Sequence, residues 1–68
     1  MRFRYQLRAV REFWEMTQTD LAKLSGLQTS AISHFESGRR TPSLKNLYRL
    51  VKALNCTADY LLGLKKSP

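Results

Sequence analysis

Five polar side chains between residues 28 and 34 are the first in the chain that could do chemistry. Residues 29, 30, 33 and 34 share one face of a helix, opposite Ile32 and Phe35. An amide can donate to and accept from the edge of an adenine, while hydroxyl and imidazole groups can contact other bases. The set is Gln28, Thr29, Ser30, Ser33 and His34. A polar face turned to solvent has the same composition, so these residues alone leave both interpretations open.

The charge of the chain indicates a partner class. Its 68 residues include 12 Lys or Arg and 5 Asp or Glu, which gives a formal net charge of +7. So high a positive charge on a small domain predicts a polyanionic partner, and nucleic acid is favoured over an acidic membrane surface. The alternative is a protein that is basic only because this keeps it soluble. With 43% hydrophobic residues, the chain can form one small core and no separate cofactor cleft.

Few residues could support catalysis or hold a metal ion. Cys56 is the only cysteine and His34 the only histidine, which excludes an internal disulfide and a cysteine-based zinc site. The sequence has no Ser-His-Asp set, no carboxylate pair in plausible geometry and no phosphate-binding glycine loop. We therefore expect neither an enzyme nor a cofactor, metal or small-molecule ligand. A free thiol is typical of the cytoplasm, and no apolar run reaches the ~20 residues of a membrane span.

Helical spacing of apolar residues, interrupted at Gly26, Gly38 and Pro42, predicts an all-α domain of five short helices. We expect them at about residues 4–15, 17–25, 28–37, 43–54 and 57–62. The second and third are joined by a tight turn containing Gly26, which is the pattern of a helix-turn-helix whose second helix enters the major groove. The apolar residues assigned to buried faces include Phe3, Leu7, Val10, Trp14, Leu21, Ala22, Leu24, Ile32, Phe35, Leu44, Leu47, Leu50, Val51 and Leu54.

Several strings, in this order and spacing, resemble the Cro/repressor-like (XRE-like) helix-turn-helix family. They are residues 16–22 (MTQTDLA), Gly26, residues 32–33 (IS), residues 36–43 (ESGRRTPS) and residues 59–63 (DYLLG). The resemblance implies a compact five-helix, lambda-repressor-like DNA-binding domain at residues 6–63, with a recognition helix at about 28–37. Residues 1–5 are then expected to form a basic N-terminal arm, and residues 64–68 a flexible basic tail.

The resemblance also implies roles for residues outside the recognition helix. Gln18 matches a Gln that holds phosphate and braces the recognition helix, and Arg11 and Glu36 match an ion pair that fixes this helix to the scaffold. Unrelated surface charges are the alternative for that pair. The loop and the helix N-terminus that follow offer cations, hydroxyls and free backbone N–H groups. The predicted phosphate contacts are Gln18, Arg39, Arg40, Thr41, Ser43 and Lys45. Relatives pair near the last helix, which here carries Cys56, Ala58, Tyr60 and Leu62.

Three positions depart from the family pattern. Gln28 stands where a Ser or Thr often caps the recognition helix, and it is a poor cap. Glu15 stands where Gly is frequent, and Phe13 where a polar residue is usual. The first departure could alter the start of the recognition helix, and Phe13 could mark an additional contact surface.

The functional expectation is a cytoplasmic, sequence-specific regulator of transcription, of bacterial or phage type, that binds double-stranded DNA. We expect a repressor that occupies a promoter as a homodimer, with half-sites ~10–10.5 base pairs apart or at a multiple of this spacing. The alternative is a protein-interaction module, such as the antitoxin of a toxin–antitoxin pair. An antitoxin usually carries a further segment for the toxin, and only residues 64–68 follow Gly63 here.

Overall fold

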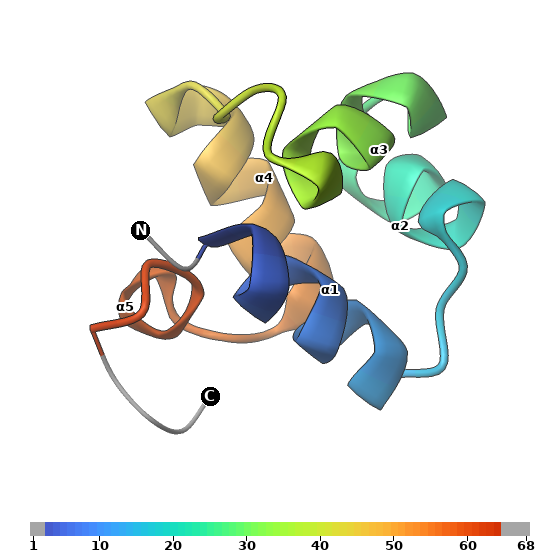
Figure 1. Cartoon of the computed structure of the whole chain (residues 1–68). Helices are drawn as coiled ribbons and strands as arrows, with labels where there is room; N and C mark the ends of the chain where they lie inside the picture. Colours follow the sequence, from blue (N-terminus) through green and yellow to red (C-terminus); the bar gives the residue numbers. More distant parts are fainter. Residues whose placement is uncertain (1–2, 65–68) are drawn as a thin grey trace.

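The computed structural model describes residues 3–64, and within them it contains five helices and no strand (Figure 1). The helices are α1 (Phe3–Phe13), α2 (Gln18–Ser25), α3 (Thr29–Ser37), α4 (Leu44–Leu54) and α5 (Ala58–Leu61). Helix α3 packs against α1 and α2, α2 also packs against α4, and α5 packs against α1 and α4. The all-α, five-helix fold predicted from the sequence is therefore confirmed.

One apolar core holds these helices together. Phe3, Leu7 and Val10 lie at the i, i+4, i+7 spacing of one helical stripe and are all buried. The remaining core residues come from the four later helices, and they are Leu21, Ala22, Ile32, Phe35, Leu50, Leu54 and Leu61. Each large side chain buried in this way stabilises the fold by ~1.5–3 kcal/mol, so every helix is tied to the core by at least one such contact.

The helix ends are defined by local hydrogen bonds. At the start of α2, the Thr17 side chain accepts from the Asp20 N–H and the Asp20 side chain accepts from the Thr17 N–H, which is a complete capping box. Ser43 and Thr57 cap α4 and α5 through their side-chain oxygens. Gly26 follows the last residue of α2. Its φ of 73° is the left-handed conformation that the tight turn into α3 requires.

The first helix differs from its predicted boundaries at both ends. It begins at Phe3, so residues 3–5 of the predicted arm form helical backbone because burial of Phe3 fixes the first turn. Residues 1–2 of the arm and residues 65–68 of the tail lie outside the described residues. At the other end α1 stops at Phe13, and Glu15 adopts a φ of 56°. Trp14 is therefore exposed rather than in the core, although its Nε1–H donates to the Leu54 carbonyl at 2.7 Å.

Two leucines predicted to be buried are exposed. Residue 25 lies angularly between Leu21 and Ala22 on α2, so Ser25 occupies the inner face and Leu24 points outward. The Ser25 hydroxyl satisfies its buried position by donating to the Leu21 carbonyl at 2.7 Å. Leu44 is exposed because it is the first residue of α4, which reaches the core at Leu50 and Leu54. None of the helices in residues 3–64 is long and apolar enough to cross a membrane.

Candidate nucleic-acid interface

Helix α3 presents its polar residues outward because its apolar residues are fixed inward. Ile32 and Phe35 are buried in the core. On the helix beyond them, Thr29 and Ser30 are exposed, while Ser33 and His34 are half-buried. The structure thus brings the predicted face together at the start and middle of one short helix. Such a row of hydroxyl and imidazole groups can donate and accept hydrogen bonds, and it carries no fixed charge of its own.

The N-terminus of α3 is not capped by a side chain. Gln28 occupies the cap position with extended backbone, and its side chain makes no capping hydrogen bond. The prediction that Gln28 is a poor cap is confirmed. Since Gln28 is exposed, its amide is available to a ligand rather than committed to the helix.

An ion pair fixes the other end of α3 to α1. Arg11 donates from Nε to Glu36 Oε2 at 2.6 Å and from Nη2 to Glu36 Oε1 at 3.0 Å. The two side chains are only 12% and 6% exposed, respectively. A third hydrogen bond, 2.7 Å from Arg11 Nη1 to the Met16 carbonyl, ties the same guanidinium to the segment before α2. The hydrogen bond to Glu36 raises the pKa of Arg11 despite the opposing effect of burial, so the guanidinium stays charged.

Gln18 joins this network from α2. Its Nε2 donates to Glu36 Oε1 at 3.2 Å, so the Glu36 carboxylate is bonded from both α1 and α2. The shared hollow is lined by Arg8, Arg11, Gln18, Ser33, Glu36 and Ser37. The bracing role implied for Gln18 therefore has a contact in the structure, and its phosphate contact stays a prediction.

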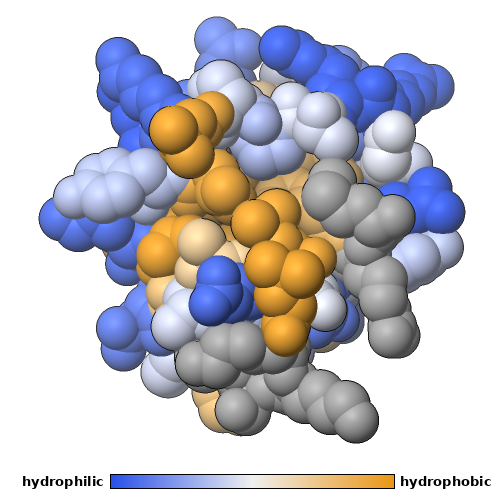
Figure 2. Space-filling view, turned by 90° about the vertical axis from the view of Figure 1, so that its left-hand side faces the viewer, coloured by the Kyte–Doolittle hydropathy of each residue, from blue (hydrophilic) through white to orange (hydrophobic). Residues whose placement is uncertain are grey.

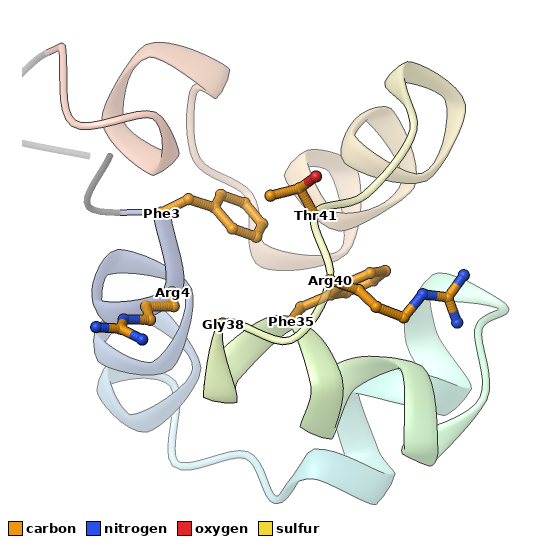
Figure 3. Close-up of a pocket in the computed structure, with 6 residues that line it drawn as sticks. All are labelled: Phe3, Arg4, Phe35, Gly38, Arg40 and Thr41. Atoms are coloured by element: carbon orange, nitrogen blue, oxygen red, sulfur yellow. The ribbon is translucent and has the colours of Figure 1, made fainter.

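The loop after α3 forms a second hollow beside the N-terminus of α1 (Figure 3). Gly38 ends α3 with a φ of 80°, and a Cβ atom there would lie 2.6 Å from Arg4 Nη1. In Figure 3 the rings of Phe3 and Phe35 face inward, whereas Arg4 and Arg40 extend outward on opposite sides. The hollow thus has two cations at its rim, Arg4 from α1 and Arg40 from the loop, and an apolar floor.

The remaining predicted phosphate contacts lie between the end of α3 and the first turn of α4. Ser43 accepts from the Asn46 N–H at 3.2 Å, which leaves its hydroxyl hydrogen free to donate. All of these residues are exposed, and they are Arg39, Arg40, Thr41, Ser43 and Lys45. Residues 39–45 contain Arg39, Arg40 and Lys45 and no carboxylate, so the region is basic.

The predicted dimer surface surrounds α5, away from α2 and α3 (Figure 1). Cys56, Ala58, Tyr60 and Leu62 are all half-buried, and Cys56, Tyr60 and Leu62 pack against the core. Burial raises the pKa of the Cys56 thiol. Figure 2 views the side on which α5 lies and shows hydrophobic residues gathered there at the surface.

Comparison with known proteins identifies the family and the fold. A helix-turn-helix family profile matches residues 7–61. Repressor protein C2 of Salmonella phage P22 is 40% identical over 57 residues, which are 84% of this chain and 26% of that protein. The chain thus spans about a quarter of the length of this curated relative.

Two solved structures superpose closely. The P22 c2 repressor in complex with a synthetic operator gives a TM-score of 0.87 at 36% identity, covering 93% of this chain and 96% of that one. The restriction-modification controller protein C.AhdI from Aeromonas hydrophila gives a TM-score of 0.85 at 37% identity, covering 88% of this chain and 91% of that one. The family and these neighbours are helix-turn-helix regulators rather than enzymes.

Proposed function

Because the chain belongs to the Cro/repressor-like (XRE-like) helix-turn-helix family, we propose that it is a regulator of transcription that binds double-stranded DNA. Within that class, the proposal is a sequence-specific repressor that occupies its operator as a homodimer. The observation that carries it is the way α3 is held. The Arg11–Glu36–Gln18 network and the buried Ile32 and Phe35 fix this helix, while its outer face is polar.

Base reading is assigned to the outer face of α3 in the major groove. Gln28 and Ser30 are exposed at its first turn, and His34 stands one turn further along. Each well-formed contact of this kind discriminates against the wrong base by ~1–3 kcal/mol. Thr29 and Ser33 complete the set.

Most of the affinity is assigned to the phosphate backbone. The outer face of α3 carries no Lys or Arg, whereas Arg39, Arg40 and Lys45 follow it directly and are exposed. Phosphate and sugar receive half to two-thirds of the hydrogen bonds in protein–DNA complexes, which suits this division. Gln18, Thr41 and Ser43 would complete the phosphate contacts.

Dimerisation is assigned to the face around α5 that carries Cys56, Ala58, Tyr60 and Leu62. These side chains are half-buried, and Cys56, Tyr60 and Leu62 pack against the core, so their exposed parts form an apolar surface that a second copy would cover. A two-fold dimer through this face would place two copies of α3 on successive major grooves of one side of the duplex.

Selection from randomised duplexes at ~0.15 M salt tests the proposal directly. We expect enrichment of a two-fold sequence whose half-site centres lie ~10–10.5 base pairs apart, or a multiple of it. Ser30→Ala should then relax specificity at one base position, by ~1–3 kcal/mol. Lys45→Gln should weaken binding to all sequences and reduce the salt slope by about one.

Lys52→Gln is the matched control for Lys45→Gln, because both lysines are exposed on α4 and each change removes one charge. We expect Lys52→Gln to leave operator affinity unchanged. If no sequence is enriched and both variants weaken binding equally, the protein has only a general attraction to polyanions, and the operator proposal is wrong.

A further inference from the structure

A second surface groove lies between the end of α2 and the second half of α4. Its lining residues are Leu24, Ser25, Tyr48, Arg49, Lys52 and Ala53. None of these residues belongs to the proposed base or phosphate contacts. The groove also excludes α5 and Leu62, so it is distinct from the proposed dimer face.

Two large apolar side chains stand at this groove without cover. Leu24 is 62% exposed and Tyr48 is 61% exposed. Leu24 is outward because Ser25 takes the inner position on α2, so its exposure follows from the register of the helix. Exposed apolar residues that line one concavity are typical of a surface that receives an apolar side chain from a partner.

The charge at this groove has one sign. Arg49 and Lys52 line it, and Lys52 Nζ lies 5.4 Å from the centre of the Tyr48 ring. No carboxylate is among the lining residues. Of the carboxylates on the helices that pack against α2 and α4, Asp20 lies in the capping box, Glu36 lies in an ion pair, and Asp59 on α5 is not among the lining residues. The groove therefore complements a partner that is acidic as well as apolar.

Duplex DNA could pair with Arg49 and Lys52, but it could not cover Leu24 and Tyr48. A B-form backbone offers phosphates and sugars, and it has no side chain to insert between Leu24 and Tyr48. A peptide helix or loop offers both chemistries within one turn, since residues three or four apart share a face. The apolar residues thus favour a protein over a nucleic acid.

We propose that this groove binds an acidic segment of another protein. An apolar side chain of the segment inserts between Leu24 and Tyr48, and its flanking carboxylates pair with Arg49 and Lys52. Because the groove lies outside the proposed DNA contacts, the protein can hold this partner and its operator together.

A synthetic helical peptide of Glu, Ala and Leu, with its Leu residues on one stripe, is the probe. Its fluorescence anisotropy with the full chain is measured at ~0.15 M salt, where long-range attraction is screened. We expect Leu24→Ser and Tyr48→Ser each to weaken binding about tenfold, and Lys52→Gln less. Amide shifts of the 15N-labelled protein should change at α2 and α4 and not along α3.

Tyr5→Ser is the matched control for Tyr48→Ser. Tyr5 is 60% exposed and has Arg4 4.7 Å from its ring centre, so it offers the same aromatic and cationic groups on α1. Equal losses for the two serine variants would mean a general attraction of acidic peptides to a basic surface, and would overturn the proposal. Displacement of the peptide by a duplex, with shifts at Leu24 and Tyr48, would assign the groove to nucleic acid instead. Circular dichroism establishes that each variant is folded.

Discussion

Replacing Glu36 by Gln tests how the recognition helix is held. The change preserves the size of the side chain and removes only its charge. In the native chain, Glu36 accepts two hydrogen bonds from Arg11, at 2.6 and 3.0 Å, and one from Gln18 at 3.2 Å. In the variant Arg11 keeps its hydrogen bond to the Met16 carbonyl but loses the partner for its charge.

The expected loss of stability follows from burial. Removing one member of a buried ion pair costs ~3–5 kcal/mol, because a charge remains without compensation. The low end, about 3 kcal/mol, applies here since Gln can still accept one hydrogen bond and Arg11 is 12% exposed. For a domain of this size, that loss lowers the melting temperature by ~12–24 °C. A core this small supplies only ~3–5 kcal/mol in total, so the variant should be partly unfolded at 25 °C.

Thermal and urea unfolding followed by circular dichroism measure the effect. Glu12→Gln is the control, because Glu12 pairs with Arg8 at 3.2 Å with both side chains exposed, and such pairs contribute only ~0–1 kcal/mol. Arg11→Met combined with Glu36→Leu should recover most of the loss, since no buried charge is then left alone. The reasoning from burial is refuted if the melting temperature of Glu36→Gln equals that of the native chain, or is no lower than that of Glu12→Gln.

Three further predictions concern single residues. Glu15→Gly should stabilise the protein by ~0.5–1 kcal/mol in urea unfolding, because Glu15 adopts a φ of 56° that Gly adopts without strain; a lower midpoint would contradict this. Hydrogen bonds with Thr17 lower the pKa of Asp20, so its stabilisation is present above the ordinary value of 3.8 and is lost as pH falls through the lower, folded-state pKa. Asp20→Asn should therefore reduce the fall in melting temperature on acidification, and an unchanged fall would count against the capping box. Because burial raises the pKa of Cys56, iodoacetamide should modify it more slowly than free cysteine at neutral pH, and unfolding in urea should remove the difference.

Much of the fold could be predicted because its signals are local. Thr17, Ser43 and Thr57 are strong caps, and each starts a helix in the structure. The spacing of apolar residues gave a wrong prediction on α2, where a shift of one residue decides which side chain is buried. Leu24 is more hydrophobic than Ser25, yet Ser25 is buried on α2 and Leu24 is exposed. The prediction ranked these residues by hydrophobicity, whereas helical geometry places residue 25 between residues 21 and 22 on the inner face.

The candidate site was predictable to a different extent. The residues on α3 follow from helical spacing, because Ile32 and Phe35 orient the helix. The Arg11–Glu36 pair joins residues 25 positions apart, and such a distance leaves no local trace, so only resemblance to a family implied it. The groove beside Leu24 could not be predicted, because it forms only where α2 packs against α4.

The two ends of α3 are held in different ways, and this bears on how the helix could read a sequence. Its last turn is fixed by Glu36, which α1 and α2 both bond, and by Gly38, which Arg4 closely approaches. Its first turn begins at Gln28 without a side-chain cap. Free backbone N–H groups and an unbonded amide are thus concentrated at the end of the helix that would enter the groove first. A stronger cap there would stabilise the helix but would use the same donors and acceptors within the protein. The missing cap therefore leaves these groups available to a ligand, while the ion pair fixes the opposite end of the helix to α1.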